Sequence, residues 1–453
     1  MYVKTIRFLV VAIFFGYNIS YGQGQSNDSI SLTLNQCITL AEKNNQNVIN
    51  KRLDELIERK KLQETRSGLL PQISGNGNYL YYLDVPTSLV ESSLFGGPPN
   101  VYSASKFQVP QNISGSIDAS LQVFNPSILT SLKLNKVSCE LSNLSTKDKI
   151  ESVIYDVSAT YLNIQINELQ IGLTKSNISN LKKNLELTTN LFKQGLALSS
   201  DVKNLELSVF NLETVLNNQM LGQNQLHRLL KVFIGLSPDK NIKTEPYTVE
   251  NKLNPQIVET DTSSYLKRTG YQTLQQTGNL IKAERKIISA GFLPNLTLIG
   301  SFGYSGFNPD YKFMQTYNDK WYPTNLVQVT LSVPIFDGLK KTRQLSQNKI
   351  KSVQSNNTLE YLKNTYRMEQ LNAIDNYNNN MKSLDFQNQN LAQANNLYNQ
   401  KLLEYKSGLA SLNDLISVDN TLKAAQANYI NAIISAELAA LDLKKANGLL
   451  INK

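Results

Sequence analysis

The sequence contains one long unit twice, and this duplication constrains the fold more than any other feature. Three short motifs recur in the same order in both halves: GLLP at 68–71 and GFLP at 291–294, LQVFN at 121–125 and SVPIFD at 332–337, FKQGLA at 192–197 and YKSGLA at 405–410. The copies lie roughly 210–225 residues apart, whereas solenoid repeats have periods of roughly 20–50 residues. Each copy must therefore be a whole architectural half, and we expect the function to depend on both.

The first 22 residues have the composition of a secretory signal peptide. Lys4 and Arg7 precede an apolar run over 8–15, and the small residues Ser20 and Gly22 follow it. The apolar run is about 8 residues long, whereas a membrane-spanning helix needs roughly 20, so an N-terminal anchor is the less favoured alternative. We therefore predict an exported chain.

Charge and cysteine content bound the function further. The formal net charge is +9 over 453 residues, and no block of five or more like charges occurs, so nucleic-acid binding is not indicated. Cys37 and Cys139 are the only cysteines, and two cysteines cannot form a disulfide framework for a chain of this length. We predict that both are buried helix residues, with a single bridge between them as the alternative.

Each half contains one very long predicted helix. Residues 126–193 contain no proline after Pro126, and residues from about 338 to 406 contain none at all. Apolar residues recur in both runs at steps of three, four or seven: Ile150, Ile154, Val157, Tyr161 and Ile164, then Tyr377, Leu384, Leu391, Tyr398 and Tyr405. This spacing is the signature of a coiled coil. At 1.5 Å per residue, about 68 residues make a rod of roughly 100 Å, which a compact domain cannot contain.

Each long helix is expected to turn back on itself as a hairpin. Gly195 and Gly408 end the long helices, and Asp201 and Asp414 provide N-terminal signals for the returning ones. One further helix opens each half, at about 35–69 and 262–292. The predicted organisation is a signal peptide (1–22), a first structural repeat (23–233), a linker or equatorial segment (234–261) and a second structural repeat (262–453).

Four segments between the helices alternate apolar with small polar residues. They cover about 72–84, 112–125, 295–306 and 326–336, with aromatic residues near their ends. Strands of roughly 10 residues with one apolar and one polar face are typical of membrane β-barrels, although a half-buried sheet of a soluble domain is the alternative. The smallest usual membrane barrel has about eight strands, so several copies would have to share one barrel.

These features together resemble the TolC-like outer-membrane efflux proteins across essentially the whole mature chain. The resemblance is carried by LTLNQCITLA at 32–41, by the two Leu-Pro helix-to-strand junctions, by the strand-to-helix junctions ending in FN and FD, and by the two glycine turns. It implies a mainly α fold with a membrane β part. Three chains would combine their coiled-coil hairpins into an α-barrel joined to a 12-stranded β-barrel, located in the cell outer membrane and extending into the periplasm.

The resemblance implies a channel, the exit duct of a tripartite efflux or type I secretion system. Its partners would be a periplasmic adaptor (membrane fusion) protein, an inner-membrane pump of the RND or ABC type, and outer-membrane lipid. Drugs, metal ions, siderophores and polypeptides are alternative cargoes. The runner-up is a periplasmic coiled-coil adaptor or a surface stalk. An enzyme is not expected, because His227 is the only histidine and no phosphate loop, HExxH or GxSxG motif occurs. No cofactor is expected either.

A gate at the hairpin turns also follows from the resemblance. Asp201 and Asp414 match acidic family positions six residues after Gly195 and Gly408, and Tyr405 matches the aromatic position three residues before the second glycine. These residues would form a periplasmic constriction. Helix capping is the alternative role of the two aspartates, and one residue can do both.

The chain departs from the family pattern at two of the gate positions. Family members with a Tyr–Arg–Asp latch carry arginine where this chain has Ala410, and a further acid where it has Ser417. An acidic constriction without that latch is therefore the prediction.

Overall fold

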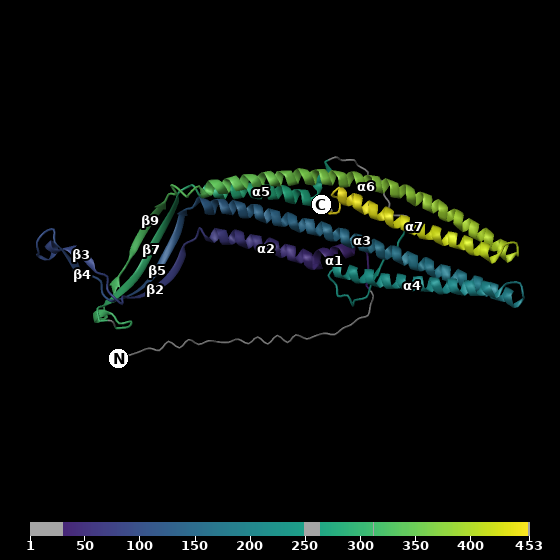
Figure 1. The fold of residues 1–453 in the computed structure, drawn as a ribbon, viewed down its shortest axis with the longest axis horizontal. Helices are drawn as coiled ribbons and strands as arrows, with labels where there is room; N and C mark the ends of the chain where they lie inside the picture. The colour runs from purple at the N-terminus through teal and green to yellow at the C-terminus, as the bar shows by residue number, and fades with distance from the viewer. Residues whose placement is uncertain (1–29, 249–262, 311, 452–453) are drawn as a thin grey trace.

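A computed structural model describes residues 30–248, 263–310 and 312–451, and the chain is elongated, with a sheet at one end and two helical tips at the other (Figure 1). The helices are α1 (Leu34–Asn44), α2 (Gln46–Ser67), α3 (Pro126–Lys193), α4 (Ser199–Phe233), α5 (Thr269–Ala290), α6 (Lys340–Lys406) and α7 (Leu412–Ala446), with 3-10 turns at Ser92–Phe95, Ser264–Lys267 and Tyr317–Asp319. The predicted signal peptide lies outside the described residues. None of the helices within these ranges has a stretch long and apolar enough to cross a membrane.

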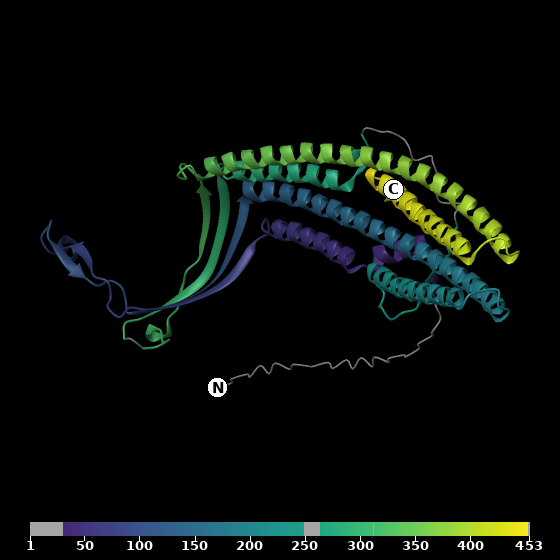
Figure 2. The same ribbon diagram turned by 45° about the vertical axis from the view of Figure 1, so that its right-hand side comes forward.

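The two long helices form the body of the molecule, as predicted. The first, α3, has 68 residues and begins directly after Asn125, whose side chain accepts hydrogen bonds from the backbone N–H groups of Ser127 and Ile128. The second, α6, has 67 residues. In the half next to the sheet, α2 packs on α3 and α5 lies between α3 and α6; in the other half, α4 returns along α3 and α7 along α6 (Figure 2). The chain therefore has four helices in each half, α2, α3, α5 and α6 next to the sheet and α4, α3, α7 and α6 towards the tips.

The sheet continues directly from the helices next to it. Its main strands are β2 (Gln72–Tyr81), β5 (Gln111–Phe124), β7 (Asn295–Asn308) and β9 (Leu326–Ser332). They are antiparallel and lie in the order β2-β5-β7-β9. The short strand β8 (Tyr322–Pro323) also pairs with β7. The predicted combination of two helical hairpins with four alternating strands is confirmed. The fourth strand is shorter than predicted, because Pro334 has no backbone N–H to continue the ladder.

A small β-hairpin projects beyond the sheet, at the end furthest from the helices. It consists of β3 (Ser88–Glu91) and β4 (Tyr102–Ser105), which pair only with each other (Figure 1). The alternating pattern does not predict it, since neither strand is longer than four residues.

A parallel strand pair near the middle of the rods was not predicted from the sequence. Strand β1 (Ile30–Leu32) pairs with β6 (Ile242–Thr244), more than 200 residues later in the chain, and both lie against α3. Strand β6 falls within the segment predicted as a linker, of which residues 249–261 lie outside the described ranges. The repeat boundaries themselves stay a prediction.

The first predicted helix is divided in two. The prediction of one helix over about 35–69 is wrong, because α1 ends at Asn44 and α2 begins at Gln46. Asn45 between them has an extended backbone, and its side chain accepts hydrogen bonds from Asn47 N and Val48 N, which caps α2. Its amide also donates to Phe233 O at 2.8 Å, so the break is fixed by the far end of α4.

The cysteines are free. Cys37 is fully buried, as predicted, and burial raises the pKa of its thiol to about 11. Cys139 is only half-buried, so the prediction that it is buried is wrong. Since both thiols are unpaired, the alternative of a bridge between them is excluded in this structure.

Candidate functional site

The two hairpin turns lie together at the tips furthest from the sheet (Figure 1). Gly195 and Gly408 have φ values of 73° and 74°, the left-handed conformation that side chains with a Cβ rarely adopt. The next N–H groups bond back across each turn, from Leu196 to Leu191 O and from Leu409 to Glu404 O, both at 2.9 Å. Both turns are therefore the same glycine-dependent helix ending, which the repeated motif predicts.

The two aspartates after the turns cap the returning helices. Asp201 accepts the backbone N–H of Leu198 at 3.1 Å, and Asp414 accepts the N–H of Ser411 at 3.0 Å and its hydroxyl at 2.7 Å. The hydroxyl and the backbone N–H of Ser411 hold the pKa of the Asp414 carboxyl below its usual value. Capping, which the sequence offered as one of two roles, is therefore present at both sites, and the constriction role stays a prediction.

Tyr405 lies inside the chain, at the joint between the two hairpins. It is buried, and its hydroxyl is 3.0 Å from the Thr188 hydroxyl of α3. Further from the tips along the same two helices, the Asn184 amide donates a hydrogen bond to the Tyr398 hydroxyl at 3.2 Å. These bonds connect α3 to α6 near the tips. Tyr405 therefore contacts Thr188 within the chain, and its role in a constriction stays a prediction.

One apolar cluster connects both tips. It includes Leu181 of α3, Leu205 and Val209 of α4, Tyr398 of α6 and Leu415 of α7, all of which are buried. The cluster places four helices from both repeats in contact, so the two tips pack as one unit. Four lysines, Lys193, Lys203, Lys401 and Lys406, occur within the same stretches of sequence as the aspartates.

The sheet has two faces of opposite character. The register places mostly aliphatic, aromatic and glycine residues on the apolar face, which includes Ile73, Ile117, Phe302, Tyr304, Val327 and Val329. It places mainly small polar residues on the polar face, which includes Ser74, Asn76, Asn78, Ser114, Ser116, Asp118, Ser120, Ser301, Gln328 and Thr330. Ile117 and Val327 of the apolar face are 62% and 75% exposed, so this chain alone leaves that face uncovered.

The edges of the chain are also uncovered. Edge strands β2 and β9 each pair on one side only. Large apolar side chains are exposed along the helices on both flanks: Leu53, Leu56 and Ile57 of α2, Leu207 and Phe210 of α4, and Ile350, Tyr361, Phe386 and Leu403 of α6. Exposed apolar surface on this scale, together with unpaired strand edges, marks surfaces that other molecules cover.

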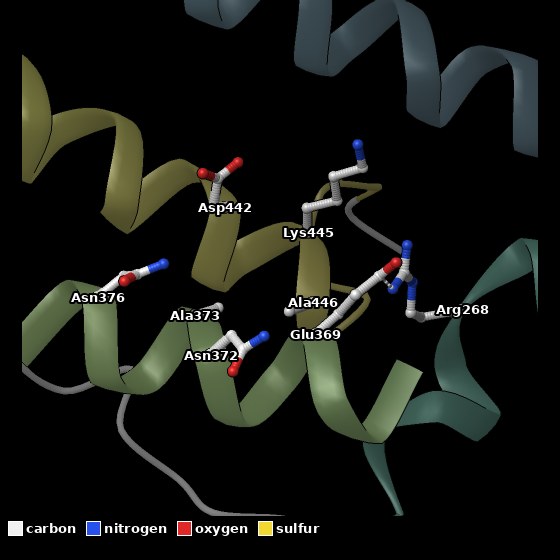
Figure 3. Close-up of a pocket in the computed structure, with 8 residues that line it drawn as sticks. All are labelled: Arg268, Glu369, Asn372, Ala373, Asn376, Asp442, Lys445 and Ala446. Carbon is white, nitrogen blue, oxygen red and sulfur yellow. Dashed lines mark hydrogen bonds and ion pairs between the residues drawn. The ribbon is translucent and has the colours of Figure 1, made fainter. Parts of the chain in front are cut away.

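A cleft of about 300 Å³ between α6 and α7 has a structural role (Figure 3). Arg268 forms an ion pair with Glu369 at 2.5 Å. Tyr155 donates a hydrogen bond to Asp442 at 2.7 Å, and the ammonium of Lys445 lies 4.1 Å from the centre of the same ring. All four charged side chains contact partners within the chain, Arg268 and Glu369 through an ion pair and Asp442 and Lys445 through Tyr155, so the cleft joins helices. Among the residues with described positions, no group of His, Cys, Asp and Glu side chains could hold a metal ion.

Two residues on which the structure depends were missed in the sequence. Tyr161 was identified only as a heptad residue, but its buried hydroxyl donates to Leu32 O at 3.0 Å and accepts the N–H of Glu245 at 3.1 Å. Asp118 lies in the predicted strand segment 112–125, and the alternation alone does not distinguish it from the other polar residues there. A signal was available, because Asp84 and Asp118 are the only charged residues of the four predicted strand segments, and only Asp118 lies away from a segment end.

Comparisons with known proteins agree with one another. The family model described as "Outer membrane efflux protein" matches residues 274–449. The chain is 22% identical over 403 residues to outer membrane protein TolC of Escherichia coli (strain K12), a match that covers 86% of this chain and 77% of that protein.

Solved structures share the fold. The CusC channel superposes with a TM-score of 0.74 at 13% identity and covers 91% of each chain. The outer membrane protein VceC of Vibrio cholerae superposes with a TM-score of 0.71 at 14% identity, covering 92% of this chain and 96% of VceC. The chain is therefore similar to the outer membrane efflux proteins over residues 274–449 and to TolC over most of its length, and it is a TolC-like outer-membrane protein.

Proposed function

We propose that this chain forms a homotrimeric duct that carries solutes from the periplasm through the outer membrane, as the exit channel of a tripartite efflux or type I secretion system. A periplasmic adaptor and an inner-membrane pump of the RND or ABC type would supply the cargo. The observation that carries the proposal is the four-stranded sheet with an exposed apolar face and two unpaired edges, continuous with helices of 67 and 68 residues.

The unpaired edges support assembly with further copies of the same chain. In an antiparallel sheet ordered β2-β5-β7-β9, β9 of one copy can pair with β2 of the next. Such pairing removes every edge once the ring closes, and lipid leaves no other partner for exposed backbone groups. One copy has too few strands for the smallest usual barrel of about eight, and three copies give the 12 strands that the family resemblance implies.

The exposed apolar residues on the helices support the same ring. Leu53 and Leu56 of α2 lie on one flank of the chain and Tyr361 of α6 on the other, each at least 50% exposed. In a closed ring, the α6 flank of one copy would meet the α2 and α4 flank of its neighbour. The helices would then enclose a cylinder along the axis of the barrel.

We place the entrance of the duct at the hairpin tips. In three copies, Asp201 and Asp414 would contribute six carboxylates around one opening, and Tyr405 would hold the two tips of each copy together through Thr188. A narrow opening with one sign of charge attracts counter-ions and repels ions of the same sign. We therefore propose that this constriction favours cations.

Assembly is the first test of the proposed function. Native mass spectrometry in detergent should report a trimer, and the purified trimer should form ion-conducting channels in planar bilayers. The protein should be recovered from the outer-membrane fraction as an oligomer that dissociates on heating. A monodisperse monomer that does not conduct would contradict the proposal. Recovery as a soluble periplasmic protein would favour the adaptor or stalk alternative.

The loops between paired strands provide a test of orientation. We predict that residues 85–111 and 307–325 face the cell exterior, because long loops lie on the extracellular side of such barrels. An epitope tag inserted near Gly97 should bind antibody on intact cells. A matched tag near Gly195, in the α3–α4 turn, should bind antibody only after the outer membrane is permeabilised. The reverse pattern of labelling would contradict this orientation.

A further inference from the structure

Asp118 is distinctive among the residues of the sheet. The segments β2, β5, β7, β8 and β9 contain no lysine, arginine, histidine or glutamate, and Asp118 is their only aspartate. It lies near the middle of the 14-residue strand β5, and the register places it between Ser74 of β2 and Ser301 of β7. A charge at that depth is costly on a lipid-facing surface, which is consistent with its position on the polar face.

The carboxylate is held in place by neutral donors from three strands. The Asn76 amide of β2 donates at 2.5 Å, the Ser116 hydroxyl of β5 donates at 3.1 Å, and the Ser301 hydroxyl of β7 donates to the other carboxylate oxygen. Hydrogen bonds from neutral groups orient a carboxylate without cancelling its charge. The full negative charge therefore remains on the polar face, at a fixed position in the middle of the strand.

We infer that Asp118 is a residue that determines ion selectivity inside the membrane part of the duct, separate from the tips. The inference rests on the proposed trimer, in which the apolar face meets lipid and the polar face lines the lumen. Three Asp118 carboxylates then form a ring within the barrel, and no cation in the strands offsets them. This ring favours the passage of cationic solutes and disfavours anions, whatever the state of the tips.

The size of the barrel determines how strong this selectivity can be. Twelve strands spaced about 4.8 Å apart and tilted by about 40° give a radius of about 12 Å, so the carboxylates lie roughly 8–9 Å from the axis. The Debye length is about 10 Å at 0.1 M salt and about 3 Å at 1 M. The ring should therefore change the potassium-to-chloride permeability ratio by roughly fivefold at 0.1 M, and by less than about 1.5-fold at 1 M.

The test is Asp118→Asn, which keeps the size of the side chain and an oxygen that can accept hydrogen bonds. Asp118→Asn is best introduced into a channel that already carries Asp201→Asn and Asp414→Asn, so that ion selectivity at the tips does not mask ion selectivity in the barrel. The reversal potential under a KCl gradient should show the permeability ratio falling roughly fivefold at 0.1 M salt and hardly at all at 1 M. The heat-modifiable trimer and its conductance serve as the control for folding.

Moving the charge provides a matched control. Ser114 lies on the same face, four residues along β5, opposite Asn78 and Ser305. Adding Ser114→Asp to the Asp118→Asn channel should restore cation preference, because the ring moves by only about 13 Å along the strand. If the Asp118→Asn channel conducts with unchanged ion selectivity at low salt, the inference about Asp118 is wrong, but the proposed function as a duct is unaffected. If the unaltered protein forms no channel, it is the proposed function that fails.

Discussion

Replacement of Tyr161 by alanine is expected to cost about 3–5 kcal/mol of unfolding free energy, the range for removing a large aromatic side chain from a core. Tyr161 is 1% exposed on α3, within the cluster that also contains Cys37 and Leu230. Its hydroxyl bonds both Leu32 O and Glu245 N, so the same change also removes two hydrogen bonds between α3 and the chain around β1 and β6, while Gln165 still donates to Glu245 O. The midpoint of chemical unfolding, followed by circular dichroism, measures the loss.

Tyr161→Phe is the control for this prediction. It keeps the ring in the core and removes only the hydroxyl, so it should cost less, about 1–3 kcal/mol for the backbone groups left without a partner. Limited proteolysis should then cut near residue 32 or 245 more readily in both variants. An alanine variant as stable as the unaltered protein would show that the strand pair does not depend on Tyr161.

Replacement of both Asp201 and Asp414 by asparagine is expected to remove most of the cation preference of the entrance. In the proposed trimer this removes six negative charges from one opening, and the permeability ratio for cations over anions should fall by at least about tenfold at low salt. Block by divalent cations should weaken as well, because it requires closely spaced carboxylates. Reversal potentials and magnesium titrations in planar bilayers measure both effects.

The double variant separates the two roles of these residues. Asp201 and Asp414 are the third residues of their helices, and asparagine there keeps an oxygen that can accept the N–H of Leu198 or Ser411, so the stability of the trimer should fall by no more than about 1 kcal/mol. Lys193 and Lys203 lie on either side of the first tip in the sequence. The predicted cation preference requires that the Asp201 and Asp414 carboxylates face the opening and that these two ammonium groups do not. Selectivity that is unchanged in the double variant would show that the aspartates only cap α4 and α7.

Much of the fold could be predicted because its signals are local. Pro126 marks the start of α3, and Gly195 and Gly408 mark both turns through their backbone conformation. Asp201 and Asp414 mark the starts of the returning helices, because each accepts the N–H of the residue three positions before it. The alternation in β5 predicts a two-faced strand because successive side chains point to opposite sides of a sheet. Duplication strengthened each signal by repeating it.

The order and type of the main elements and the positions of the turns follow from the sequence alone. Only the folded structure shows which distant residues meet: Tyr405 with Thr188, β1 with β6, and Asp118 with Ser301. It also decided that the first helix divides at Asn45, whose amide bonds the end of α4. The physical reason is that local signals act through backbone preferences within a few residues, whereas these contacts depend on which faces of distant elements pack together.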